Sequence, residues 1–302
     1  MRGTILPPET VRKYNSRAAY LFSLYLNLSP GAITIDALTE MSDACNMTYE
    51  RAYAELLAAC LDIDASGGDK ALFKNYIIPA VHMLDAEKFK SDPYFKNIKL
   101  PEIKRGRWEL TKMKFAPCEA FVCDEFIKTE NCELVPQIGF FTEEFEFPAI
   151  KENGREWMTL MPDETTTTIP SVNRAFGNVL TYGLGLGYFA YMCSEKENVS
   201  SVTVVEISDD AASLFREFIL PQFPHADKVK IIAADAFEFA GSGKTAGYDF
   251  IFADIWHDVG DGMEMYKKFK SLEAKNPSAV YDYWLERSIS YYLDKSLWQN
   301  LY

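Results

Sequence analysis

The segment Gly183-Leu184-Gly185-Leu186-Gly187 has the residue pattern of a ligand-binding loop. It directly follows the apolar run Val179–Tyr182, which is typical of a buried strand. Glycine residues let the backbone turn sharply and approach a ligand closely, because they carry no Cβ. In the dinucleotide fingerprint GxGxxG the third glycine would fall at Tyr188, whose ring crowds the space that a pyrophosphate needs. The spacing therefore favours a nucleoside-like ligand without phosphate groups.

Three acidic residues stand at the ends of three further predicted strands. Glu206 lies 19 residues after Gly187, where a carboxylate can accept hydrogen bonds from both hydroxyls of a ribose. Asp235 is placed to accept from an adenine amino group, while the backbone N–H of the adjacent Ala236 donates to the ring. Asp254 follows the fourth strand. Because ligands of doubly wound sheets bind at the carboxyl ends of the strands, these residues should surround one ligand.

The elements that position these residues alternate between strand and helix from about residue 178 onward. The predicted strands are Val179–Tyr182, Val202–Glu206, Val229–Ala233 and Tyr248–Asp254, and the predicted helices are Tyr188–Glu195 and Asp209–Leu220. The strands are mostly continuous apolar runs, so helices should cover both faces of a parallel sheet. We therefore predict an α/β fold with a Rossmann-like, doubly wound sheet. A fifth strand is predicted near Val280–Trp284, and the lack of later candidates predicts a sheet truncated after it.

The chain before residue 171 has two other patterns. Residues 1–100 are helical in pattern, residues 101–170 form a small antiparallel β-rich region, and residues 171–302 form the Rossmann-like domain. The helical region has predicted helices at Pro8–Leu28, Ile35–Ala44 and Glu50–Leu61, with Thr48 as an N-cap, and the β-rich region has a predicted hairpin turn at Asn153-Gly154. The second and third helices have the outline of a helix-turn-helix. Because Arg51 is the single basic residue of the third helix, packing or dimerisation is favoured over DNA recognition.

Residues 178 to 256 resemble the class I S-adenosylmethionine-dependent methyltransferase superfamily, which includes the spermidine synthase-like aminopropyltransferases. The resemblance rests on the glycine loop, on the acids Glu206 and Asp235, and on the strand that ends at Asp254. It implies S-adenosylmethionine as cofactor, with the three loop glycines at its methionine portion, Glu206 at the ribose and Asp235 at the adenine. The candidate cofactor-binding residues are Tyr182, Gly183, Gly185, Gly187, Glu206, Ile207, Asp235, Ala236, Asp254 and Trp256.

Two positions depart from the patterns of this superfamily. Most methyltransferases have an acidic residue two places before the first glycine, and here that residue is Thr181. Spermidine synthases also lack this acid, which favours that branch. Those enzymes, however, carry an Asp-Ser/Thr-Ser/Thr-Asp-Pro type motif after the fourth strand. This chain has Asp254-Ile255-Trp256-His257-Asp258 there, so only Asp254 matches by position.

Transfer of an alkyl group from a sulfonium requires alignment of the nucleophile and a base for its proton. Asp254 is the first candidate base, and His257 is the second because its ordinary pKa lies near neutrality. Trp256 is placed to form a wall of the acceptor pocket or to face the cationic sulfonium. By position, Met161–Thr168 resembles the segment that caps the cofactor in this superfamily, which makes Glu164 and Thr165 candidate substrate-pocket residues. The alternative for this segment is a polar linker.

The sequence thus predicts an S-adenosylmethionine-dependent methyltransferase that acts on a small molecule, with no metal site. The alternatives are transfer of an aminopropyl-type group and a non-catalytic sensor of S-adenosyl ligands. A formal net charge of −13 disfavours nucleic acid and anionic membranes as partners. The absence of a signal peptide and of a long apolar run predicts a cytoplasmic protein, and the N-terminal helices offer a surface for oligomerisation.

Two further segments imitate functional motifs. Gly241-Ser242-Gly243-Lys244-Thr245 resembles the end of a phosphate-binding P-loop, but position 238 is Glu instead of Gly and a strand is predicted to follow. Lys104-Arg105-Gly106-Arg107 is the one dense basic cluster. We interpret both segments as solvated loops.

Overall fold

The computed structural model describes residues 6–299, which form two compact units. The first unit gathers residues 6–86, 114–145 and 290–299, and the second gathers residues 87–113 and 146–289. Each unit is therefore built from segments that lie far apart in the sequence. The three consecutive ranges that were predicted as domains do not follow this division. Within the described residues, every helix is too short or too polar to cross a bilayer.

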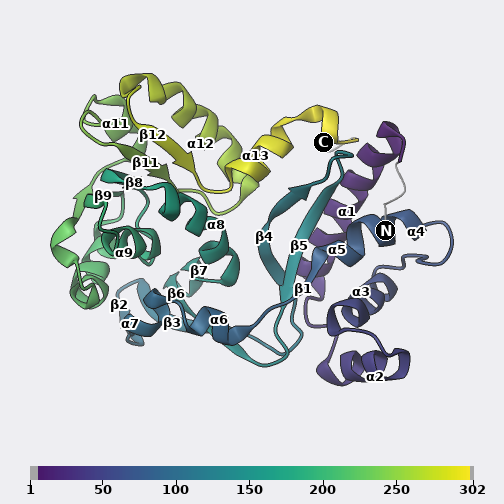
Figure 1. The fold of residues 1–302 in the computed structure, drawn as a ribbon. Helices are drawn as coiled ribbons and strands as arrows, with labels where there is room; N and C mark the ends of the chain where they lie inside the picture. The colour runs from purple at the N-terminus through teal and green to yellow at the C-terminus, as the bar shows by residue number, and fades with distance from the viewer. Residues whose placement is uncertain (1–5, 300–302) are drawn as a thin grey trace. The chain divides into compact units, whose positions relative to one another are not determined.

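The first unit combines helices with a three-stranded sheet (Figure 1). Its helices are α1 (Pro8–Leu28), α2 (Ile35–Cys45), α3 (Tyr49–Cys60), α4 (Lys70–Leu72) and α5 (Ile78–Ala80), with a π-helical turn at Phe73–Ile77, and its strands are β1 (Val81–Met83), β4 (Phe121–Lys128) and β5 (Leu134–Phe140). The first three helices confirm the predictions, and the Thr48 hydroxyl caps α3 by accepting from the N–H of Arg51. Arg51 itself pairs with Glu55 and lies over the ring of Phe73, so its charge is used within the unit.

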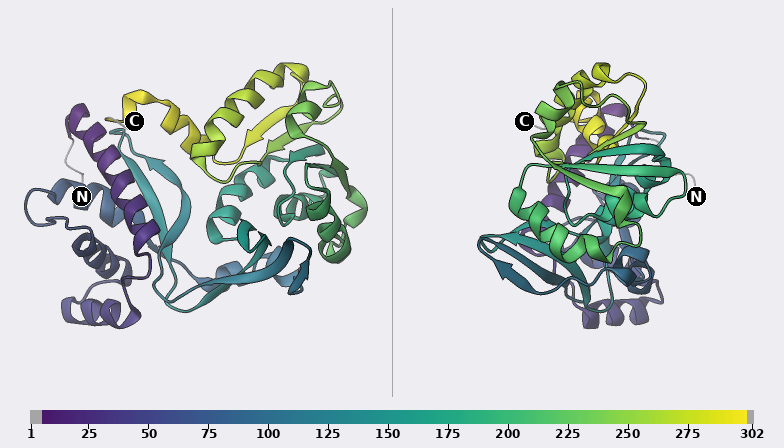
Figure 2. Two further views of the ribbon diagram at one scale, coloured as in Figure 1. Left: turned by 180° about the vertical axis from the view of Figure 1, so that it is seen from behind. Right: turned by 90° about the vertical axis from the view of Figure 1, so that its left-hand side faces the viewer.

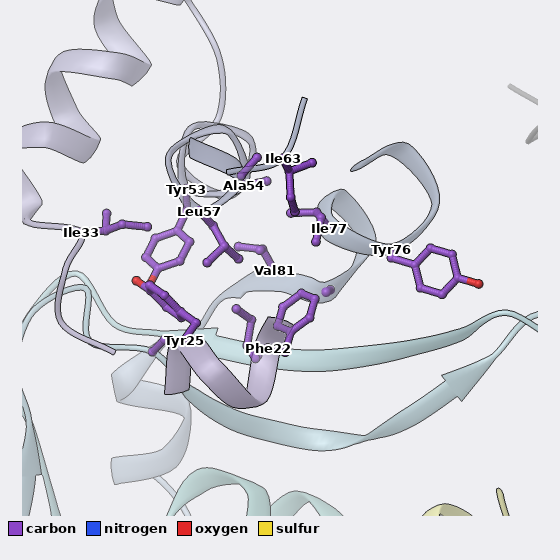
Figure 3. Packing of buried hydrophobic residues seen from close by; sticks show 14 of the residues in the cluster. Phe22, Tyr25, Ile33, Tyr53, Ala54, Leu57, Ile63, Tyr76, Ile77 and Val81 are labelled. Atoms are coloured by element: carbon purple, nitrogen blue, oxygen red, sulfur yellow. The ribbon is translucent and has the colours of Figure 1, made fainter. Parts of the chain in front are cut away.

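The core of the first unit forms where α1 and α3 pack beside the sheet (Figure 3). Phe22, Tyr25 and Leu57 are buried there, while Leu28, which was predicted on the same face of α1, is exposed at the helix end. The buried Asn15 connects distant segments: its amide donates to the carbonyls of Cys132 and Leu297, and its oxygen accepts from Leu134 N–H. Residues near the end of the chain thereby belong to the same unit as α1.

The second unit contains a parallel five-stranded sheet in the order β10-β9-β8-β11-β12. The strands are β8 (Gly177–Tyr182), β9 (Val199–Glu206), β10 (Val229–Ala233), β11 (Phe250–Ala253) and β12 (Val280–Tyr283). The order reverses between β8 and β11, whose carboxyl ends hold the glycine loop and Asp254. This is the mixed α/β, Rossmann-like arrangement that the alternating pattern predicted. The truncation of the sheet stays a prediction.

Helices cover both faces of this sheet (Figures 1 and 2). They are α9 (Tyr188–Ser194), α10 (Asp209–Leu214), α11 (Ala236–Gly241) and α12 (Val259–Leu272), with α13 (Glu286–Leu293) after β12. The ring of Phe189 in α9 stacks on Phe252 from one side, while Tyr182 packs against Phe239 and Phe269 of α11 and α12 on the other. The helix predicted at Asp209–Leu220 is α10 followed by a π-helical and a 3-10 turn.

An antiparallel sheet in the order β2-β3-β6-β7 belongs mainly to the second unit. Its strands are β2 (Ile103–Arg105), β3 (Trp108–Phe115), β6 (Phe145–Glu152) and β7 (Arg155–Thr159), preceded by the short helices α6 (Ala86–Lys90) and α7 (Pro93–Asn97). The predicted Asn153-Gly154 turn joins β6 to β7, and both residues have positive φ angles. The predicted small antiparallel β-rich region is divided between the two units, because β5 pairs with β1 and with β4 in the first unit.

The segment before β8 is a helix, α8 (Pro162–Arg174), so its interpretation as a polar linker was wrong. Pro162 occupies the first turn, where a missing N–H costs nothing. The hydroxyls of Thr165 and Thr167 donate to the carbonyls of Pro162 and Asp163 in the preceding turn. These local bonds allow a threonine-rich segment of low helix propensity to remain helical.

Candidate S-adenosyl-ligand site

The glycine loop joins β8 to α9 through three residues with positive φ angles, Gly183 (94°), Gly185 (50°) and Gly187 (79°). A Cβ at Gly183 would overlap the backbone carbonyl of Asp254, and one at Gly187 would overlap the ring of Phe215. At Gly185 the space is filled by the thioether of Met158 from β7. The loop is therefore glycine-rich because neighbouring protein atoms approach it closely, and at Gly183 this approach fixes the backbone position of Asp254.

Replacing Gly183 with Ala is expected to destabilise the protein by more than about 2 kcal/mol. The left-handed conformation alone costs about 1–2 kcal/mol for a residue with a Cβ, and the rigid carbonyl of Asp254 cannot move aside as a side chain would. Chemical denaturation measures the loss. Gly243, which also has a positive φ angle but open space around it, provides the control: Gly243→Ala should cost about 1 kcal/mol. Equal losses in the two variants would contradict the steric argument.

Glu206 ends β9 and is buried beside the glycine loop. Its carboxylate accepts from the N–H groups of Leu184 (3.1 Å) and Ser208 (2.7 Å). Burial raises the pKa of Glu206, while these backbone donors oppose the rise. Each carboxylate oxygen retains a lone pair for another donor. The side chain is thus held in place and can accept from ligand hydroxyl groups.

A pocket of about 360 Å³ lies at the carboxyl ends of β8, β9, β10 and β11 and is also walled by β7 and α8. Its lining includes most of the predicted cofactor residues: Gly183, Gly185, Glu206, Ile207, Asp235, Ala236, Asp254 and Trp256, together with Glu164 and His257. Its lining also includes Glu156, Trp157, Met158, Asp163 and Trp284, which sequence reasoning missed. Among residues 6–299, no lysine or arginine lines the pocket.

Three candidate residues lie outside this lining. Tyr182 alternates with Thr181 along β8, so its ring enters the core on the face covered by α11 and α12. Gly187 packs against Phe215 and begins α9. Thr165 is buried with its hydroxyl bonded to Pro162 in α8. These residues support the walls of the pocket without facing it.

Asp254 and Glu164 form an acidic pair at the inner end of the pocket. Both residues line it and are half-buried. Burial raises the pKa of Asp254 to about 7. Burial also raises the pKa of Glu164 well above its ordinary value, and the charges of Asp163, Asp254 and Glu156 raise it further. A carboxyl group with a pKa near neutrality can accept a proton in one step and release it in the next.

We expect this pair to make the ligand-free protein less stable as the pH rises from about 5 to about 8. A carboxyl group whose pKa is raised by folding stabilises the folded state fully below the unfolded-chain pKa of about 4, and this contribution is lost as the pH passes through the folded-state value. Asp254→Asn should remove about 1–3 kcal/mol of this pH dependence. Thermal denaturation at both pH values measures it. A wild-type melting temperature that rises relative to the variant over this range would contradict the shift.

His257 and Trp157 stand nearer the surface than Trp256 does. The His257 side chain is 66% exposed, and its Nδ1 lies 3.3 Å from Asp261 Oδ2. The ring of Trp157 meets the imidazole edge-on with 6.0 Å between centroids. Trp256 is buried, and its Nε1 donates to the carbonyl of Trp284. His257 is therefore at the mouth of the pocket, whereas Asp254 is deep inside it.

The two segments that imitate other motifs have structural explanations. Arg105 pairs with Glu217, and Arg107 pairs with Glu152, so the basic cluster is largely neutralised within the second unit. The Gly241–Thr245 segment follows α11 and leads into β11, whereas a P-loop would open a helix. Neither segment has the arrangement of a phosphate-binding site.

No family model matches the sequence, and no curated protein is found to match it. Among solved structures, the chain is similar to a precorrin 8W decarboxylase from Methanobacterium thermoautotrophicum, with 17% identity, a TM-score of 0.32, and coverage of 41% of this chain and 63% of that one. It is also similar to a probable spermidine synthase from Corynebacterium glutamicum, with 25% identity, a TM-score of 0.30, and coverage of 36% and 44%. The chain thus spans less than two thirds of each.

Proposed function

We propose that the second unit is a transferase that moves an alkyl group from an S-adenosyl sulfonium to an amine of a small molecule. The observation that carries this proposal is the composition of the pocket. Acidic residues line it from β7, α8, β9 and the loops after β10 and β11, and no lysine or arginine in the described part of the chain does. Such a lining attracts cations and repels phosphates. A sulfonium donor and an amine acceptor are both cationic before reaction.

The nucleoside of the donor fits the outer part of the pocket. Glu206 is held by two backbone N–H groups with lone pairs left for ribose hydroxyls. Asp235 caps α11 by accepting from Glu238 N–H, which fixes its carboxylate at the pocket edge beside Ala236. Ile207, which is 68% exposed in the absence of ligand, offers apolar surface for the base. These residues would hold the adenosine portion, and the reacting sulfonium would face Asp254.

Asp254 supplies the base for the acceptor. In the reaction a carbon–nitrogen bond forms and the carbon–sulfur bond breaks, and the electron pair of the broken bond remains on sulfur. The nitrogen loses one proton, which Asp254 accepts. Its raised pKa matches this role, because a base that titrates near neutrality is both deprotonated often enough and basic enough to take the proton. The neighbouring Glu164, Asp163 and Glu156 would attract and orient the cationic acceptor.

The transferred group distinguishes two candidate reactions. Methyl transfer from S-adenosylmethionine is the reaction that the sequence predicted. Aminopropyl transfer is favoured by one observation: the donor of that reaction is decarboxylated, so it places no carboxylate among the acidic side chains of the pocket. For S-adenosylmethionine, the α-carboxylate would have to be bound without a lysine or arginine of the lining, by uncharged donors such as backbone N–H groups of the glycine loop.

Isothermal titration with S-adenosylmethionine, its decarboxylated form and S-adenosylhomocysteine tests the binding step. We expect at least one sulfonium to bind more tightly than the neutral thioether, because the acidic pocket favours positive charge. If none of the three binds, the proposal fails.

Mass spectrometry of reactions with a panel of mono- and diamines then separates the candidates. A mass gain of one methyl group or of one aminopropyl group identifies the reaction. Binding without any product in this panel would support a sensor of S-adenosyl ligands instead of an enzyme.

A further inference from the structure

A small chamber lies behind the acidic pair, separate from the main body of the pocket. It has a volume of about 20 Å³. Its lining includes the polar residues Asp254, Glu164, Thr168 and Thr181, together with Tyr188, whose hydroxyl donates to Asp92, and apolar residues such as Leu160 and Phe189. Met158, Glu164, Gly183, Leu184 and Asp254 line both spaces.

The size and the lining of the chamber suit one water molecule. A cavity needs roughly 10–15 Å³ to hold a water, and the water needs about two to four polar partners. The chamber is only slightly larger than this minimum and has four candidate partners. An amine or a ligand fragment of several heavy atoms would not fit. An isolated carboxylate in such an apolar space would lose much of its solvation, and a bridging water offsets part of that loss.

Of the residues that could bind a water in the chamber, Thr181 is the one whose hydroxyl has no carbonyl of a preceding helical turn to bond to. A threonine in a helix can donate to a carbonyl one turn earlier, as Thr165 and Thr167 do in α8, and Thr168 has the same opportunity. In a parallel strand such as β8 the backbone groups are used by the ladder, and Thr181 pairs with Val204 and Phe252. Its hydroxyl is therefore free to serve the chamber.

We propose that this chamber is a binding site for a single water molecule that bridges Asp254 and Glu164 and is anchored by the Thr181 hydroxyl. Thr181 is then a positioning residue that acts on Asp254 through the water. The inference rests on the proposed function for its catalytic meaning. Two neighbouring carboxylates inside one pocket repel each other unless one of them is protonated. The bridging water lets Asp254 and Glu164 share one proton, so that the other carboxyl group of the pair stays deprotonated and can act as a base.

The charged groups around the pair set the direction of its titration. Asp163 on α8 and Glu156 on β7 add negative charge beside Glu164. His257 lines the outer pocket, and the hydroxyl of Tyr188, which lines the chamber, donates to Asp92 at 2.9 Å. Because acidic residues predominate around Asp254 and Glu164, hydrogen bonds from the water and from Thr181 are needed to stabilise the charged form of the pair. Loss of the Thr181 hydroxyl and of the water should therefore raise the lower apparent pKa of the pair, at which its first proton dissociates.

The test is a carbon-13 NMR titration of the Asp and Glu carboxyl groups in the full-length, ligand-free protein. We expect Thr181→Val, which keeps the side-chain shape but removes the hydroxyl, to raise the first apparent pKa of the pair by about one unit. Thr181→Ser retains the hydroxyl and should restore the wild-type value. Thr203→Val is the matched control, because Thr203 is a buried threonine of the adjacent strand β9 that lines neither space.

An unchanged titration in Thr181→Val would overturn the proposal, as would a high-resolution crystal structure without density for a water between Asp254, Glu164 and Thr181. If Thr181→Val does not fold, the crystal structure of the wild-type protein decides. Failure of the proposed function is recognised separately, because it appears as a lack of S-adenosyl-ligand binding, whereas the titration needs no ligand.

Discussion

Asp254→Asn is expected to lower kcat by about 10²–10⁴-fold while changing the Kd for the sulfonium donor by less than about tenfold. The substitution keeps the shape of the side chain and removes the group that accepts the proton. The position of Asp254 is fixed by its N–H bond to the carbonyl of Tyr182 and by the close approach of Gly183. The amide should therefore occupy the same place without acting as a base.

The pH profile and a second variant check the assignment. In the wild-type enzyme, kcat should rise with pH up to about 7, where Asp254 becomes deprotonated, and then level off. His257→Asn should change kcat by less than about threefold, because the imidazole is mostly exposed and turned toward Asp261. A larger loss in His257→Asn than in Asp254→Asn would reverse the roles. Because Asp254→Asn is also expected to be more stable at pH 8, unfolding cannot explain its loss of activity.

The sheet of the second unit could be predicted because its central strands β8, β9 and β11 are buried apolar runs, whereas β10 and β12 at the edges are more exposed. The strands β8, β9, β10 and β11 each lead, at their carboxyl ends, to a glycine or an acidic residue. This pattern alone predicts that Gly183, Glu206, Asp235 and Asp254 lie at one edge of the sheet. The hairpin of β6 and β7 could be predicted for another reason, because the dipeptide Asn-Gly favours a tight turn whatever the tertiary surroundings.

The wall formed by β7 could not be predicted in this way. Glu156, Trp157 and Met158 reach the glycine loop by tertiary packing across about 27 residues of chain, and alternation along a strand does not say which face meets a ligand. The pairing of β1 with β5 could not be predicted either, because the three residues of β1 are too few to show the alternation of apolar and polar side chains that marks a strand. The helical state of α8 was hidden by its run of threonines.

The direction of the Tyr182 side chain could have been predicted from the alternation along its strand. Thr181 and Tyr182 are consecutive in a strand, so their side chains must point to opposite faces, and only one can face the pocket. Nearness to Gly183 in sequence suggested Tyr182, whereas the structure places Thr181 beside Asp254 and buries the Tyr182 ring against Phe269. The same alternation, used with the known location of Asp254, would have selected Thr181.

Glu206→Gln is expected to weaken binding of S-adenosyl ligands by about 10–100-fold. The carboxylate can form charge-assisted bonds to ribose hydroxyls, which contribute about 1.5–3 kcal/mol each, and the amide can offer only weaker ones. The amide also meets two fixed N–H donors, from Leu184 and Ser208, with a single oxygen. One of these donors must face an NH₂ group, so the side chain cannot keep its orientation. Isothermal titration measures the loss.

Methylthioadenosine separates the two ends of the pocket in this experiment, because it carries the adenosine portion without the amino-acid chain. Glu206→Gln should weaken its binding as strongly as that of the complete donor, whereas Glu164→Gln should leave it unchanged and affect only ligands that reach Asp254. Asp209→Asn, which removes one negative charge from an exposed residue just beyond Ile207, controls for the general loss of charge. If Asp209→Asn and Glu206→Gln weaken binding equally, the effect is long-range electrostatics, and the carboxylate of Glu206 does not hold the ribose.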